Sequence, residues 1–220
     1  MKKFDWASFF SNILAVVLGI FITFGIQGLI DRRSEKKDVL SALELVKEEL
    51  VNNKAGLMEV IGIVCSEKEA AEYINSKLGK FSQADADTIV AMNAVLGNDY
   101  YFTVTDDALE LLKSSSLFQK INDKSLALGI IRAYDYLAAN SQAFNTHEKY
   151  KTSLYGDISS DRVKKASLSS AGTDFFRIFY SSDEGRYFLK SVIEMSDDYY
   201  LRAGIPEIEE AIKDIESRLR

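Results

Sequence analysis

The sequence predicts an all-α protein in which one N-terminal transmembrane helix continues into a long helix and then into a helical bundle domain. Three observations predict this architecture. Phe9 to Ile30 is a run of 22 residues without a charge. Along most of the remaining chain, apolar residues recur in steps of three and four, the period of a helix with one buried face. Pro206 is the only proline, and scarce proline favours long helices over a fold with many turns.

The uncharged run, residues 9–30, is long enough to cross a bilayer. At about 1.5 Å per residue it reaches roughly 33 Å, against a hydrocarbon core of about 30 Å. Lys2 and Lys3 precede it, so a cleaved signal peptide is the alternative. The run is longer than the apolar core of a signal peptide and no Ala-x-Ala-like site follows, which favours an uncleaved anchor. The predicted parts are a tail (1–8), the span (9–30), a charged juxtamembrane collar (31–38) and an acidic helical domain (39–220).

One face of the predicted span carries small or polar residues at every fourth position. They are Ser11, Ala15, Gly19, Thr23 and Gln27. This spacing lets two membrane helices approach closely, and Gln27 can hydrogen-bond across such a contact. Chance is the alternative, because membrane helices are rich in small residues. The orientation of the span stays open, since basic residues flank both of its ends.

A heptad seam follows the collar and extends over nearly four repeats. Its members are Val39, Leu43, Val46, Leu50, Asn53, Leu57, Val60 and Val64. One interpretation is a parallel coiled coil in which Asn53 fixes the register. The other is an amphipathic helix packed against its own domain. Leu40, Val51 and Ile61 widen the apolar stripe beyond a strict seam, which favours the second interpretation.

Turn and capping signals divide the rest of the chain into further helices. Ser66–Glu69 has the form of a capping box, which marks either a new helix or a position inside the long one. Gly79 should end that helix. The next helix should start at 82–85 and end near Leu96, and 100–104 reads as an extended piece. Thr105 is then the expected N-cap of a helix over 106–114.

The C-terminal half should consist of three helices and a loop. A long helix is expected from Asp123 to about Leu154, followed by a Ser- and Gly-rich loop over 155–173. A second capping-box form, Ser181–Glu184, should start the next helix. Gly204-Ile205-Pro206 should break the chain and open the last one, because proline suits the first turn of a helix. We expect this last helix to lie antiparallel to the helix after the collar.

Composition and the search for reactive groups exclude several classes of function. The net charge is −6, whereas a nucleic-acid-binding surface needs a basic stripe. Cys65 is the only cysteine, which excludes an intrachain disulfide and a thiolate zinc site. His147 is the only histidine, and we expect it on the surface. No phosphate-binding glycine motif is present. We therefore expect no catalytic residue, no metal site and no cofactor.

Several segments resemble an uncharacterised family of single-span bacterial membrane proteins that is frequent in Bacteroidetes. The similar segments are 15–22 in the span, 46–50 after it, 108–115 and 121–126 in mid-chain, and the Ile- and Glu-rich closing helix. The resemblance implies an N-terminal span joined to a helical domain in the bacterial cytoplasmic membrane. It implies no activity.

Two functions are consistent with this sequence. The favoured one is a non-enzymatic, membrane-anchored helical module that binds a protein partner and can self-associate through its span. The alternative is a ligand-sensing helical bundle that signals through a membrane partner. The expected partners are the lipid bilayer and either another protein or a second copy of the chain.

Overall fold

The computed structural model describes residues 6–82, 85–158, 173–196 and 198–220, and the side chains of 33–82, 85–156, 175–196 and 198–220. All regular structure in these ranges is helical, as predicted. The helices are α1 (Trp6–Lys77), α2 (Ala86–Gly97), α3 (Asp107–Ser114), a short 3-10 helix η2 (Phe118–Lys120), α4 (Lys124–Ile158), α6 (Thr173–Ser181), α7 (Asp183–Met195), α8 (Tyr199–Arg202) and α9 (Ile205–Leu219).

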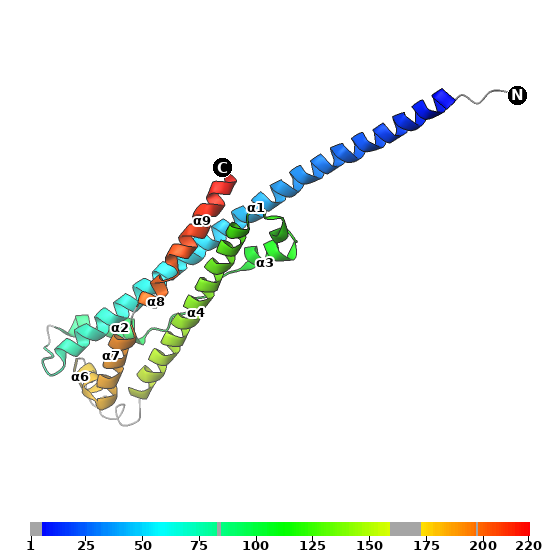
Figure 1. Ribbon diagram of the computed structural model, residues 1–220. Coiled ribbons are helices and arrows are strands. Elements are labelled where there is room, and N and C mark those ends of the chain that lie inside the picture. The colour runs from blue at the N-terminus through cyan, green and yellow to red at the C-terminus, as the bar shows by residue number, and fades with distance from the viewer. Residues whose placement is uncertain (1–5, 83–84, 159–172, 197) are drawn as a thin grey trace.

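One continuous helix, α1, organises the molecule. Its 72 residues run without a break from Trp6, so the segment predicted to span and the helix after the collar share one backbone. The N-terminal part projects beyond the bundle, and the C-terminal part packs against α2, α3, α4, α7 and α9 (Figure 1). From Val39 onward, α1 packs against the apolar core of the bundle.

The predicted membrane span cannot be compared directly with the described side chains. Among these, no helix has an apolar stretch long enough to cross a membrane. The span, residues 9–30, and its predicted packing face (Ser11, Ala15, Gly19, Thr23 and Gln27) lie outside the described side chains.

The heptad seam faces the core of the chain's own bundle. Seven of its members are buried: Leu43, Val46, Leu50, Asn53, Leu57, Val60 and Val64. Val39 packs against the same cluster and is partly exposed. The partners in this first core come from α3, α4 and α9, among them Leu112, Ile130 and Ile215. The seam is therefore occupied within the monomer.

Asn53 has a different role from the predicted setting of a coiled-coil register. Its side-chain amide donates to the Thr105 carbonyl oxygen at 2.7 Å, and its Oδ1 accepts from the Thr105 backbone N–H at 3.0 Å. The Thr105 hydroxyl also donates to Oδ1, at 3.2 Å. Thr105 was predicted to be the N-cap of this helix. This prediction was wrong by one residue, because Asp106 is the N-cap of α3. Thr105 instead holds the start of α3 against α1.

Two helix ends lie at their predicted signals, Gly79 and Pro206. By contrast, α4 continues to Ile158 instead of ending near Leu154, and α6, which was not predicted, begins at Thr173. Of the predicted loop 155–173, residues 159–172 lie outside the described residues.

Gly79 adopts a φ of +76°, a conformation that favours glycine, just after α1 ends. The capping box predicted at Ser181–Glu184 is off by one residue, because Ser181 ends α6 and Ser182 caps α7 by accepting from the Gly185 N–H at 3.0 Å. A side chain at Gly185 would clash with the Phe179 carbonyl oxygen. Pro206 lies in the first turn of α9. Ser66, by contrast, lies within α1 and donates to the Gly62 carbonyl oxygen.

The last helix returns along α1 in the opposite direction, as expected (Figure 1). Ile208, Ala211 and Ile215 enter the first core, and Lys54 pairs with Glu209 at 2.6 Å. A second core lies at the other end of the bundle. It joins α1, α2, α6 and α7 through Ala70, Ala71, Ile74, Leu96, Phe179, Tyr180, Phe188, Leu189 and Val192. Leu154 and Tyr155 of α4 are partly buried against it.

Asp123 fixes the start of α4 and provides a test of the fold by pH. The N–H of Leu126, the guanidinium of Arg218 and Ser125 all bond to its carboxylate, and they lower its pKa below the ordinary value of 3.8. A carboxyl group with a lowered pKa stabilises the fold above that ordinary value, and this contribution is lost as the pH falls through the folded-state pKa. We expect D123A to unfold more readily than wild type near neutral pH.

The difference in unfolding free energy between D123A and wild type should become smaller in acid. Urea unfolding at a series of pH values measures this difference. D123N is the control, because it keeps the capping oxygen and loses the charge. A gap between D123A and wild type that does not change with pH would contradict the assignment.

Candidate functional site

A layer of buried polar side chains separates the two apolar cores. On α1 the first core ends near Val64 and the second begins at Ala70, with Glu67 between them. On α4 the first core ends at Phe144 and the second begins at Leu154, and His147, Glu148 and Lys151 lie between them. We call these four residues the polar layer. Each of the four is 0–7% exposed.

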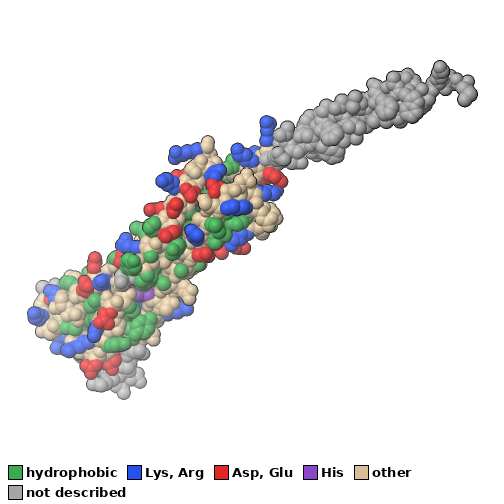
Figure 2. Space-filling model, in the orientation of Figure 1, with side chains coloured by type: hydrophobic (Ala, Val, Ile, Leu, Met, Phe, Trp, Pro, Cys, Tyr) green, Lys and Arg blue, Asp and Glu red, His purple; other side chains and the backbone are tan. Residues whose placement is uncertain are grey.

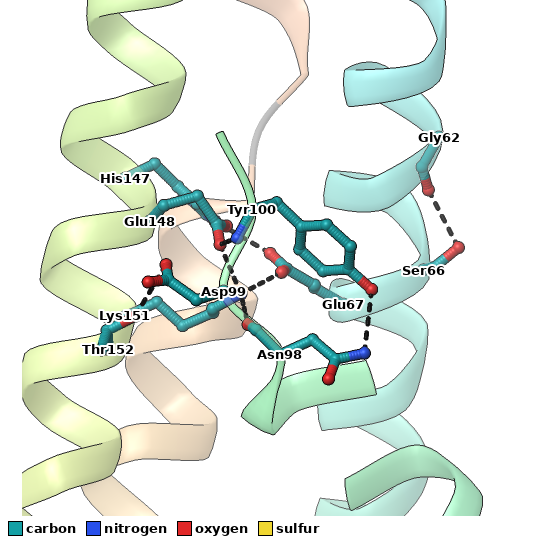
Figure 3. A network of polar contacts seen from close by, with 10 residues as sticks. All are labelled: Gly62, Ser66, Glu67, Asn98, Asp99, Tyr100, His147, Glu148, Lys151 and Thr152. Atoms are coloured by element: carbon teal, nitrogen blue, oxygen red, sulfur yellow. Dashed lines mark hydrogen bonds and ion pairs between the residues drawn. The ribbon is translucent and has the colours of Figure 1, made fainter. Parts of the chain in front are cut away.

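The helical period explains why these side chains meet. Glu67 continues the α1 seam three residues after Val64, and His147 follows Phe144 by three residues on the buried face of α4. Lys151 is one turn further along this face. Figure 3 shows the polar layer between α1 and α4, with Asn98–Tyr100 of the chain after α2 passing beside it.

Lys151 joins the two carboxylates of the polar layer. Its ammonium donates to Glu67 Oε1, to Glu148 Oε2 at 2.8 Å, and to the Asn98 carbonyl oxygen at 2.9 Å. The Tyr100 ring lies below the same ammonium, 5.4 Å from its centroid. Three hydrogen bonds and an aromatic face replace the water that this buried cation has lost.

His147 and Glu148 complete the polar layer. The Nε2–H of His147 donates to Glu67 Oε2 at 3.0 Å. Glu148 Oε2 accepts from the Tyr100 backbone N–H at 3.0 Å. Glu148 Oε1 has no hydrogen-bond partner among the described residues, and it lies 3.9 Å from His147 Nε2. Burial raises the pKa of the Glu148 carboxyl above its ordinary value, while the Lys151 bond opposes this shift.

The surface position predicted for His147 is wrong. Lys149 and Tyr150 are exposed and make the local sequence look polar, but His147 faces inward. Sequence reasoning also missed Glu67, Glu148 and Lys151. The available signal was the period itself, since Glu67 and His147 occupy positions where an apolar residue was due.

Chemically, the polar layer is a buried ion network with one imidazole. It contains no hydroxyl or thiol nucleophile within reach of His147 among the described contacts, so it lacks the pairing that activates a serine or cysteine. The groups of the polar layer that can coordinate a metal are two carboxylates and one imidazole, and this set suits a divalent metal ion. Glu67, His147 and Glu148 form a group of three that could hold a metal ion, so the expectation of no metal site stays a prediction.

Replacing Lys151 should show how strongly the polar layer depends on its cation. K151M keeps an unbranched side chain as far as Cε and leaves the two buried carboxylates, Glu67 and Glu148, without their shared counter-charge. We expect a loss of about 3–5 kcal/mol in unfolding free energy, measured by chemical denaturation of the full chain in detergent.

K149M is the matched control, because Lys149 is in the same helix, two residues before Lys151, and is exposed. Its effect should stay within about 0.5 kcal/mol. Equal stability of K151M and wild type would show that the carboxylates do not depend on this ammonium.

Comparisons of the chain with protein-family models, with curated proteins and with solved structures give no match. The resemblance to a family of single-span bacterial membrane proteins therefore stays a prediction, and the function has to be argued from the geometry of this chain.

Proposed function

We propose that the protein is a non-enzymatic helical module, anchored in a bacterial cytoplasmic membrane by residues 9–30, that binds a protein partner. The continuity of α1 carries this proposal. One helix contains the uncharged run and one wall of both apolar cores. An anchored run would therefore hold the bundle by a helix rather than by a flexible linker.

The charges that follow the run also support anchoring. Arg33, Lys36 and Lys37 are exposed where α1 enters the bundle, beside the Lys120–Glu35 ion pair at 2.7 Å. Basic side chains next to a span interact favourably with anionic lipid headgroups. Elsewhere on the visible face, acidic and basic side chains are interspersed with exposed apolar ones (Figure 2).

The best candidate for the partner surface is a groove between α1 and α3. It has a volume of about 410 Å³ and is lined by Leu45, Glu48, Glu49, Asn52, Thr105, Asp107, Ala108 and Leu111. Leu45 and Leu111 are 47% and 51% exposed, a high value for leucine in a folded domain. Glu48 and Asp107 are exposed beside them.

Glu49 holds this groove in shape. Its carboxylate accepts from the Tyr134 hydroxyl at 2.5 Å and from the Ala108 N–H at 3.0 Å, so it links α1, α3 and α4. Burial and this bond raise the pKa of the Tyr134 hydroxyl. A groove with two exposed leucines and acidic edges fits a partner helix that carries leucine-sized and basic side chains. We take such a helix as the partner.

A ligand-sensing bundle is the second candidate function. The observation that favours it is a hollow of about 670 Å³ at the end of the bundle near the projecting part of α1, lined by Val39, Leu40, Leu43, Lys120, Ile121 and Leu126 among others. This volume is in the range of small-molecule sites. Thermal stabilisation by a small molecule in the absence of any partner would favour the sensor over the interaction module.

Anchoring is tested by placing charges in the uncharged run. L18R/I22R adds two arginines near its centre, each of which costs about 2.5–3.5 kcal/mol in membrane insertion. We expect the variant to leave the membrane pellet after carbonate extraction, whereas wild type stays in it. V51R/M58R is the control, because it adds the same charge to exposed positions of α1 in the bundle. Wild type in the soluble fraction would refute anchoring.

The partner surface is tested by reversing its apolar character. L45D/L111D should reduce crosslinked partner at least tenfold in native membranes, because two buried carboxylates would face an apolar helix surface. L128D is the control on α4, where Leu128 is 54% exposed outside the groove. The captured chain should contain a basic amphipathic helix by mass spectrometry. Equal capture by L45D/L111D and L128D would exclude the groove.

A further inference from the structure

The polar layer uses only half of its carboxylate oxygens to hold Lys151. The ammonium takes Oε1 of Glu67 and Oε2 of Glu148. The two remaining oxygens, Glu67 Oε2 and Glu148 Oε1, lie 3.0 Å and 3.9 Å from His147 Nε2. Glu67, His147 and Glu148 each offer one ligand atom within 4.8 Å of the other two. The layer thus has a cation on one side and three converging ligand atoms on the other (Figure 3).

We propose that Glu67 Oε2, His147 Nε2 and Glu148 Oε1 bind a divalent transition-metal ion, with zinc as the probe. Zinc bonds to nitrogen and carboxylate oxygen at about 2.0–2.2 Å, which places neighbouring ligands of a tetrahedral site about 3.4 Å apart. The separations of Glu67 Oε2 and Glu148 Oε1 from His147 Nε2, 3.0 Å and 3.9 Å, lie on either side of this value.

Glu148 Oε1 is the independent evidence for a bound cation. The Glu148 side chain is 1% exposed, and Oε1 has no hydrogen-bond partner among the described residues. A buried carboxylate oxygen without a partner is costly. Lys151 and the Tyr100 N–H both hold the other oxygen, Oε2, and so keep Oε1 directed at His147. A metal ion between these groups would satisfy it.

The charges around this position favour a cation. With a neutral imidazole, as a metal ligand must be, two carboxylates and one ammonium leave the layer with a single net negative charge. When His147 coordinates through Nε2, the proton of the neutral imidazole lies on Nδ1, so the metal ion takes the place of the Nε2–H that otherwise bonds to Glu67. Lys151 then acts as an outer partner that orients both ligating carboxylates.

The site would act as a structural clamp between α1 and α4. Glu67 comes from one helix and His147 and Glu148 from the other, at the level where apolar contacts between the two cores are interrupted. The ligands are 0–7% exposed, so the ion would enter when the chain from Asn98 to Tyr100 moves aside or as the bundle folds. This role is independent of the proposed membrane anchoring and partner binding.

The test measures metal binding by the full chain in detergent after removal of bound metal with a chelator. We expect one Zn²⁺ or Co²⁺ per chain, a visible absorption band for the cobalt form, and a Tm that rises with Zn²⁺ concentration. H147Q removes the only imidazole of the chain. We expect its affinity for Zn²⁺ to fall by at least about 10- to 100-fold, the loss that removal of an outer-shell partner alone typically causes.

E148Q is the second ligand variant and should show the same loss of affinity. E69Q is the matched control, since Glu69 is exposed on α1 two residues from Glu67. Circular dichroism confirms that each variant keeps its helices. The proposal is overturned if folded H147Q and E148Q bind Zn²⁺ as tightly as E69Q. It is also overturned if wild type binds no stoichiometric metal.

Discussion

The structure depends on one constraint: a single helix must satisfy two apolar cores and a polar layer along the same face. From Ala42 to Val64, α1 supplies one wall of the first core, and from Ala70 to Ile74 it supplies one wall of the second. Glu67 interrupts this face and would carry an unpaired buried charge if α4 did not provide Lys151 and His147. The register of α4 against α1 is therefore set by charge pairing as well as by apolar contact.

The two apolar cores and the polar layer differ in how well they tolerate a shift of one helix along another. Apolar contacts give the two cores most of their free energy but tolerate small shifts of one helix along another. A buried network of short hydrogen bonds does not tolerate such shifts, because each broken bond leaves a charged group without water. The polar layer thus contributes specificity of packing, whether or not it also holds a metal ion.

Much of the fold could be predicted from the sequence, because its signals are local. Gly79 and Pro206 mark helix ends through backbone conformations that need no knowledge of the partner helices. The capping-box form at Ser181–Glu184 predicted the start of α7 to within one residue. The seam from Leu43 to Val64 identified the buried face of α1 by its period. Whether that face met a second chain or its own domain depends on contacts distant in sequence, and the widened stripe favoured the arrangement observed.

The candidate site could not be predicted, because it is assembled across 80 residues of sequence. Glu67 looked like part of a capping box, and His147 looked like a surface residue among charged neighbours. Nothing in either segment indicates that the other lies 3.0 Å away. The period placed both residues on buried faces, but a charged residue at one apolar position is common and carries little information without its partner.

The length of α1 sets the reach of the molecule. Between Arg33 and Lys77 the helix rises about 1.5 Å per residue, or roughly 66 Å in all. We consider the case in which the uncharged run lies in a membrane and α1 leaves it along the membrane normal. The end of the bundle with the second core, formed by α2, α6 and α7, then lies well away from the lipid headgroups. The groove beside Leu45 lies much closer to them. A partner in the same membrane would meet the groove, while the far end could contact only molecules that extend about as far from the surface.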